Sequence, residues 1–245
     1  MHDKSRLVLF NGPRHSGKDE AANYCAEEFG ATRFKMSGPI KAAIKAMFAL
    51  TDEDVALLET IKTEPSPLLF GLSYVQAQIS ISEDWAKKVW GKDFFGRMAS
   101  GAVERWERYA GKGNLYVCSD SGFAEEAASL VYDVISPENT LLVQLFRPGK
   151  SFDGDSRSYI SLAGVKTITV ANDGNLEDYH RTLKEVVLDW LDHKRPEETM
   201  AKAKSSTVAS YDPDDYMVSG CPDGFCPMPT IRQGPSEAMF APIND

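Results

Sequence analysis

The residues with the clearest chemistry form a short loop between the first expected strand and the first expected helix. Gly12 and Gly17 bound this loop, and Lys18 follows at once. Glycines let consecutive backbone N–H groups turn toward a phosphate, and the start of a helix adds its positive end. A lysine here can reach the β- and γ-phosphates of ATP. The segment predicts an ATP-binding loop with these contact residues: Gly12, Pro13, Arg14, His15, Ser16, Gly17, Lys18 and Asp19.

Two acidic residues predict a magnesium site beside this loop. Phosphate loops of this type usually close with Ser or Thr, whose hydroxyl binds Mg²⁺, but here the position is Asp19. A carboxylate can also hold Mg²⁺, directly or through water. Asp120 directly follows an expected buried strand and can orient Mg²⁺ through its water shell or accept the acceptor's proton. A plain helix cap is the alternative interpretation of Asp120.

Ligands of open parallel sheets bind beyond the carboxyl ends of the strands, and other strands deliver polar residues there. Ser37 and Lys41 follow the second strand and predict a second anion site, for the acceptor; a solvated helix start explains them equally well. Arg147 and Arg157 lie in one polar loop, typical of a lid that brings guanidinium groups onto transferring phosphates. An ordinary surface loop is the alternative interpretation.

The fifth expected strand ends in a turn that contains Asn172 and Gly174. The backbone of such a turn can contact the edge of an adenine ring, so both residues are candidates for ATP binding. A simple turn with a helix cap accounts for them equally well.

Apolar runs and helical spacing alternate along the chain, which predicts an α/β protein with a five-stranded parallel sheet flanked by helices. The expected strands are 6–11, 31–36, 115–119, 140–146 and 166–171. The expected helices are 18–29, 38–50, 51–62, 73–110, 123–135 and 176–193. Aromatic residues of the 73–110 block are expected to pack it onto the sheet: Trp85, Trp90, Phe94, Phe95 and Trp106.

The same pattern predicts one domain over 1–194. It contains an inserted helical acceptor region at about 51–110 and a lid-like loop at 147–164. Seven of the thirteen prolines lie in 196–245, where three Lys/Arg face eight Asp/Glu. We therefore expect 195–245 to be an extended or disordered acidic tail.

Composition excludes some classes of protein. A net charge of −9 argues against a surface that clamps nucleic acid over its whole extent. No run approaches the ~20 apolar residues of a membrane span. The sequence is thus expected to be soluble and cytoplasmic, without a membrane partner.

Several stretches together resemble bacteriophage deoxynucleoside monophosphate kinases. They are Gly12–Asp19, Met36–Lys41, Ser119–Asp120, Phe146–Gly149 and Ala171–Leu176. The resemblance implies an adenylate-kinase-like fold of the P-loop NTPase class and host-cytoplasmic location if the gene is phage-borne. It also implies ATP and Mg²⁺ as cofactors, with a deoxynucleotide acceptor between Ser37–Lys41, the helices of 73–110 and Asp120.

One departure from that family leaves the acceptor open. Members often carry an arginine two residues after the third-strand aspartate, whereas this chain has Gly122; Arg157 is expected to compensate. Alternatively, the acceptor is 5-hydroxymethyluracil within phage DNA, which related kinases phosphorylate and which presents no terminal phosphate. Other small-molecule kinases, such as those for dephospho-coenzyme A or phosphomevalonate, and a non-catalytic nucleotide-binding module remain further hypotheses.

Overall fold

The computed structural model describes residues 4–192, and the tail expected at 195–245 lies outside them. Its centre is a five-stranded sheet in which every pairing is parallel, in the order β2-β3-β1-β4-β5. The strands are β1 (Arg6–Asn11), β2 (Thr32–Phe34), β3 (Leu115–Cys118), β4 (Thr140–Phe146) and β5 (Lys166–Ala171). The predicted α/β fold with its phosphate loop between the first strand and helix is confirmed.

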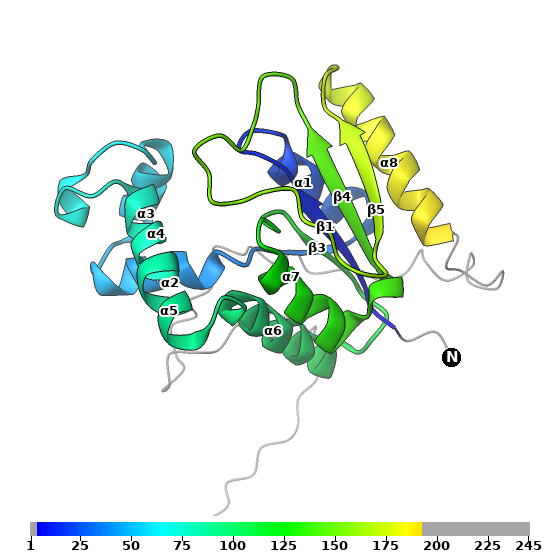
Figure 1. The fold of residues 1–245 in the computed structure, drawn as a ribbon, viewed down its shortest axis with the longest axis horizontal. Coiled ribbons are helices and arrows are strands. Elements are labelled where there is room, and N and C mark those ends of the chain that lie inside the picture. Colours follow the sequence, from blue (N-terminus) through cyan, green and yellow to red (C-terminus); the bar gives the residue numbers. More distant parts are fainter. Residues whose placement is uncertain (1–3, 193–245) are drawn as a thin grey trace, which may run out of the picture.

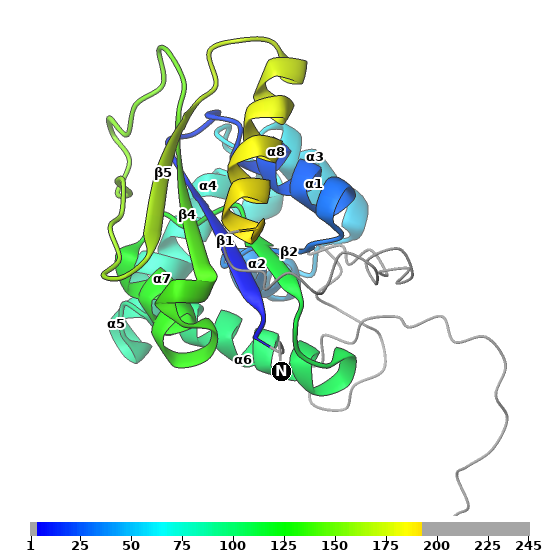
Figure 2. The same ribbon diagram turned by 90° about the vertical axis from the view of Figure 1, so that its right-hand side faces the viewer.

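Helices cover both faces of the sheet (Figures 1 and 2). On one face lie α1 (Lys18–Phe29) and α8 (Leu176–Asp192), and on the other α6 (Phe94–Ala110) and α7 (Ala124–Leu130). A lobe beside the sheet contains α2 (Gly38–Met47), α3 (Asp52–Thr60), α4 (Tyr74–Ile79) and α5 (Lys87–Trp90). No helix of the described chain is long and apolar enough to cross a membrane.

Short irregular helices complete these elements. Turns of 3₁₀-helix lie at η1 (Pro67–Leu69) and η4 (Pro137–Asn139), and π-helical segments at η2 (Ser80–Ala86) and η3 (Val131–Ile135). The π-helical segments replace parts of the long helices expected at 73–110 and 123–135. Hydrophobic spacing does not distinguish one widened turn from an ordinary α-helical one, so they were not foreseen.

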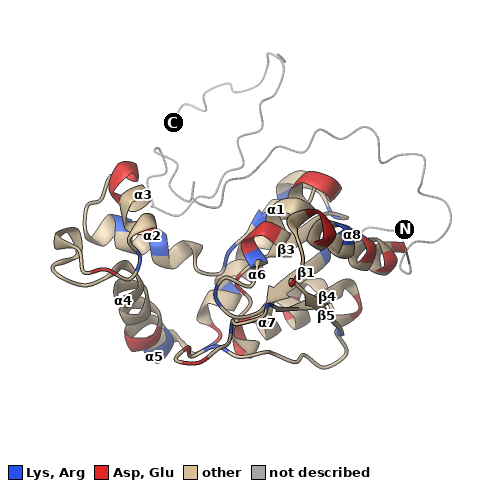
Figure 3. Ribbon diagram, turned by 90° about the horizontal axis from the view of Figure 1, so that it is seen from above, with Lys and Arg blue, Asp and Glu red and all other residues tan. Residues whose placement is uncertain are grey.

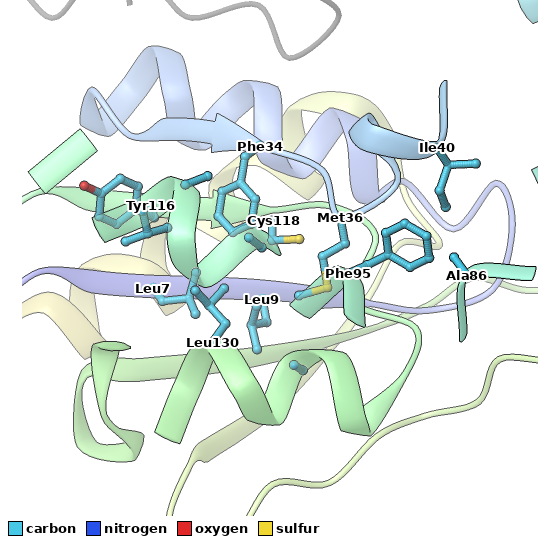
Figure 4. Packing of buried hydrophobic residues seen from close by; sticks show 14 of the residues in the cluster. Leu7, Leu9, Phe34, Met36, Ile40, Ala86, Phe95, Tyr116, Cys118 and Leu130 are labelled. Carbon is cyan, nitrogen blue, oxygen red and sulfur yellow. The ribbon is translucent and has the colours of Figure 1, made fainter. Parts of the chain in front are cut away.

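The central strand β1 is almost continuously apolar because both of its faces are covered by helices. Successive side chains of a strand point to opposite faces. Leu7 and Leu9 enter the core shared with α6, α7 and the lobe, whereas Val8 and Phe10 enter the core shared with α1 and α8. All four are fully buried. Figure 4 shows Leu7 and Leu9 among the first of these cores.

The aromatic residues of the 73–110 block divide into two groups. Phe95 and Trp106 are buried in the core against the sheet, as expected. Trp85 and Trp90 are 49% and 43% exposed, so the prediction that they pack onto the sheet was wrong. They belong to η2 and α5 in the lobe, where Trp90 contacts Trp85 and Phe94 at ring-centroid distances of 5.0 and 4.8 Å.

A buried ion pair joins the lobe to the sheet domain. Lys87 of α5 lies 2.8 Å from Glu126 of α7 and 2.8 Å from Glu83 of η2, and its ammonium stands 3.4 Å from the centre of the Phe123 ring. Burial raises the pKa of Glu126 to about 7, against the opposing effect of the Lys87 ammonium. The pair fixes the lobe close to the end of β3, from which Asp120 projects.

The loop after β4 contains neither helix nor strand, as predicted for 147–164. Its second half is tied to the sheet through Asn11 at the end of β1. The Asn11 amide accepts a hydrogen bond from the Ile160 N–H and donates to the carbonyls of Ser158 and Ser121. Gln144 of β4 donates to the Ile160 carbonyl at 2.9 Å. These bonds place the loop over the carboxyl ends of β1 and β4.

Candidate active site

The phosphate loop occupies the carboxyl end of β1 and is supported from outside. His15 and Gly17 have φ angles of 61° and 102°, a left-handed conformation that glycine adopts without strain and histidine rarely does. The Asn172 amide donates to the Ser16 carbonyl at 3.0 Å, and the Tyr179 hydroxyl donates to the Gly17 carbonyl at 3.1 Å. The end of β5 and helix α8 thus hold the loop in shape.

This arrangement gives the Asn172 side chain a structural role that was not expected. Its side chain supports the phosphate loop, and Gly174 lies exposed in the following turn. Contact of either residue with adenine stays a prediction. Tyr179 was missed, because a tyrosine at helical spacing in an amphipathic segment is indistinguishable from a core residue.

Lys18, at the start of α1, folds over its own loop. Its ammonium donates to the carbonyls of Gly12 and Pro13 at 2.8 and 2.6 Å. Burial, and next the positive charge of Arg157, lower the pKa of Lys18 to about 8. The negative charges of Asp19, Asp120 and Asp155 partly oppose this lowering of the Lys18 pKa.

Asp19 is held by two donors from other elements. Its Oδ1 accepts from the Ser119 hydroxyl at 2.8 Å and from the Lys35 ammonium at 2.9 Å. Partial desolvation of the carboxyl group opposes ionisation, but Lys35 and these hydrogen bonds outweigh it and keep the pKa of Asp19 below its usual value. Ser119 and Lys35 were not predicted as site residues, although Lys35 directly precedes the segment that was.

Asp120 binds the backbone between β2 and α2. Its two carboxylate oxygens accept from the N–H groups of Met36 and Ser37, at 2.8 and 2.9 Å. It therefore caps neither the helix that follows it nor its own turn, and the Ser37 backbone is fixed beside the phosphate loop. Oδ1 also accepts from the Cys118 thiol at 3.2 Å, so among the bonds of residues 4–192 it is Oδ2 that keeps another lone pair. A role in metal binding or proton transfer stays a prediction.

The oxygen donors at this edge fit a magnesium ion. Asp19, Ser119 and Asp120 supply carboxylate and hydroxyl groups, which are the hard ligands Mg²⁺ prefers. Among residues 4–192, no three His, Cys, Asp or Glu side chains are grouped to hold a metal alone. The donor set therefore suits an ion bound mainly through water and substrate phosphates, as Mg²⁺ usually is.

Arg157 lies across Gly122, two residues after Asp120. A Cβ built on Gly122 would stand 2.3 Å from Cδ of Arg157 and 2.7 Å from its Cγ, so the arginine stem fills the space of the missing side chain. The guanidinium donates from Nε and Nη2 to both carboxylate oxygens of Asp155. Arg14 of the phosphate loop also faces Asp155, at 3.6 Å. The stem of Arg157 thus lies beside position 122, and its compensation for an arginine at that position stays a prediction.

The two remaining predicted cations behave differently. Arg147 donates to the His15 carbonyl at 3.2 Å and so lies on the phosphate loop. Lys41 forms an ion pair with Glu59 of α3 at 2.6 Å, directing it toward the lobe helices. Its predicted acceptor contact remains untested.

Comparison with known sequences gives one informative similarity. No family model matches the chain. A protein of Acanthamoeba polyphaga mimivirus named "Putative deoxynucleotide monophosphate kinase" is 25% identical over 187 residues, which cover 71% of this chain and 92% of the viral protein. The similarity thus extends over nearly the whole relative.

Two of the solved structures that are similar to this chain are named as kinases. A sugar kinase from Janibacter sp. shares 15% identity over 77% of this chain and 95% of its own, with a TM-score of 0.41. Dephospho-CoA kinase from Campylobacter jejuni shares 14% identity over 78% of this chain and 100% of its own, with a TM-score of 0.39. The predicted class, an ATP-dependent phosphotransferase, agrees with the name of the mimivirus protein.

Proposed function

We propose that this chain is an ATP-dependent kinase that transfers the γ-phosphoryl group to a deoxynucleoside monophosphate, with Mg²⁺ as cofactor. The phosphate loop, the oxygen donors of Asp19 and Asp120, and the similar mimivirus protein support this function. The mimivirus protein's name also motivates the choice of acceptor.

The position of Arg157 across Gly122 carries the acceptor assignment. A nucleoside monophosphate brings a dianionic phosphate that requires cationic donors, and the planar guanidinium fork binds phosphate oxygens in pairs. Arg157 binds Asp155, which also faces Arg14 of the phosphate loop, and this shared partner supports a role for its guanidinium beside that loop. In the free protein, Asp155 occupies the fork in the way that a phosphate would.

The chemistry requires positioning and charge more than covalent participation. An oxygen of the acceptor phosphate bonds to the γ-phosphorus while the bond to the β–γ bridging oxygen breaks, and ADP leaves with that electron pair. Lys18 and the loop N–H groups hold the β- and γ-phosphates, and Arg157 orients the acceptor phosphate. When bound, Mg²⁺ neutralises charge on the β- and γ-oxygens. Asp120 keeps the Met36–Ser37 backbone at the acceptor side.

A base within DNA is the competing acceptor. The exposed Trp85 and Trp90 favour it, because aromatic side chains can stack on an unpaired base. Charge does not favour it: Lys88, Lys92 and Arg97 near these rings each pair with an acidic residue. Figure 3 shows acidic and basic residues interspersed over the helices in this view.

ADP release separates these acceptors. The enzyme would be assayed with each of the four common dNMPs, with duplex and single-stranded DNA containing 5-hydroxymethyluracil, and with unmodified DNA as control. We expect release with at least one dNMP and little change in acceptor KM between 50 and 200 mM salt. Release only with hydroxymethyluracil DNA, weakening steeply with salt, would replace the proposed acceptor. Absence of release with all of these acceptors would refute both proposed acceptors and leave another small-molecule kinase or a non-catalytic nucleotide-binding module.

A further inference from the structure

Lys35 connects the two carboxylates of the site. Its ammonium lies 2.9 Å from Oδ1 of Asp19, and the next two residues, Met36 and Ser37, donate their N–H groups to Asp120. Its side chain is only 20% exposed although it ends in a charge. A solvated surface lysine would not be enclosed in this way, so the ion pair is part of the architecture of the site.

Asp19 needs such support because it projects from the first turn of α1. Its side chain is 66% exposed, and rotation about χ1 would carry the carboxylate into solvent. Among the described residues, both donors that bond this carboxylate approach the same atom, Oδ1. They fix one oxygen and leave the lone pairs of Oδ2 for other ligands.

We propose that Lys35 is a positioning residue for Asp19: together with Ser119 it fixes Oδ1, so that Oδ2 is presented to the Mg²⁺ ion of the bound nucleotide. This role rests on the proposed function, because it requires that the protein bind a nucleotide together with Mg²⁺. It does not depend on which acceptor receives the phosphoryl group. It also explains how an aspartate serves where phosphate loops usually have Ser or Thr. The longer, charged side chain requires a second element to hold it.

Positioning and charge predict opposite results when Lys35 is replaced. If its charge mainly competes with the metal, Lys35→Met should strengthen Mg²⁺ binding, because a neighbouring positive charge is removed. If it mainly holds Asp19, the substitution should weaken Mg²⁺ binding. Lys35→Arg retains the charge and the donors, so it should preserve most of the Mg²⁺ binding. Lys35→Gln retains only a weaker, uncharged donor, so its Mg²⁺ binding should lie between those of Lys35→Arg and Lys35→Met.

The test is nucleotide affinity, which does not depend on turnover. The Kd of a fluorescent ADP analogue would be measured in EDTA and in Mg²⁺, for wild type, Lys35→Met, Lys35→Gln and Lys35→Arg. Lys166→Met is the matched control. Lys166 is also ion-paired, with Asp189 at 3.2 Å, but it begins β5 and so lies at the end of the sheet opposite to the site. We expect the Kd of Lys35→Met in EDTA to stay within twofold of the wild-type value. The Mg²⁺-dependent gain, which is the ratio of the Kd in EDTA to the Kd in Mg²⁺, should fall at least threefold.

Ser119→Ala gives an independent check on the shared oxygen. If both side chains fix Oδ1, their contributions to Mg²⁺ binding are coupled. The fold-loss of the Mg²⁺-dependent gain in the double variant Lys35→Met/Ser119→Ala should then be smaller than the product of the two single fold-losses. A Mg²⁺-dependent gain that is unchanged or larger in Lys35→Met would overturn the role of Lys35 alone. A wild type without any gain from Mg²⁺ would instead overturn the magnesium part of the proposed function, and this inference with it.

Discussion

Arg157 lies in the space that a side chain at Gly122 would occupy. The two residues are 35 positions apart, and the loop after β4 brings them together through the bonds of Asn11 to Ser158 and Ile160. Glycine at 122 is thus required by close approach of another side chain. A side chain from a different segment thus fills the space beside the residue two positions after Asp120.

Gly122→Ala should therefore impair acceptor use while leaving ATP binding intact. The new methyl group would overlap Cδ of Arg157 and displace its guanidinium. We expect the acceptor KM to rise at least fivefold, with the KM for ATP within twofold of wild type. Gly101→Ala in α6 is the control, because its Cβ would meet only the end of Arg105 at 3.4 Å. A normal acceptor KM in Gly122→Ala would contradict the packing described.

Arg157→Ala should have a stronger effect of the same kind. A charge-assisted hydrogen bond contributes roughly 1.5–3 kcal/mol, so its loss should raise the acceptor KM more than tenfold. Steady-state kinetics with dNMP as the varied substrate checks this. Arg108→Ala, at an exposed position near the end of α6, serves as control. Unchanged acceptor KM together with full dNMP activity would refute the role assigned to Arg157.

Lys18→Ala should abolish most phosphoryl transfer without unfolding the protein. The substitution removes one positive charge from the β- and γ-phosphates in the transition state. Loss of such a preorganised contact typically lowers the rate by about 10²–10³. Single-turnover kinetics measures the chemical step, and the melting temperature serves to verify the fold. Near wild-type turnover would contradict the phosphate-loop assignment.

The buried Glu126 makes stability depend on pH. Its pKa is about 7 in the folded protein and near 4.5 when unfolded, so the folded state holds this proton more tightly. The resulting stabilisation is fully present below about pH 4.5 and is lost as pH rises to 7 and above. The shift corresponds to a loss on the order of 3 kcal/mol across that interval.

Glu126→Gln should remove this component. We expect the wild-type free energy of unfolding to decline more steeply between pH 5 and 8 than that of Glu126→Gln, as measured by urea titration at each pH. The control is Glu125→Gln, since Glu125 is the exposed neighbour on the same turn of α7. Parallel wild-type and Glu126→Gln profiles would show that the carboxyl group titrates normally.

The sequence was sufficient for the sheet and the phosphate loop, because both follow from local patterns. Strand ends such as Phe146 and Ala171 coincide with the predicted limits, and Lys18 lies where a helix was expected to begin. What could not be read is which residues meet across the fold. Lys35, Ser119 and Tyr179 became recognisable only when three strand ends and α8 were placed around one loop. The exposure of Trp85 and Trp90 depends similarly on where the lobe lies.

The bonds from Asp120 to the N–H groups of Met36 and Ser37 have a consequence for how related sequences can diverge. Every residue except proline offers a backbone N–H, so side chains at 36 and 37 can change without loss of this contact, provided that the buried position 36 stays apolar. The carboxylate at 120 has no such freedom, since asparagine presents one accepting oxygen where two are used. Divergence among relatives should therefore be tolerated at the receiving loop and resisted at the aspartate.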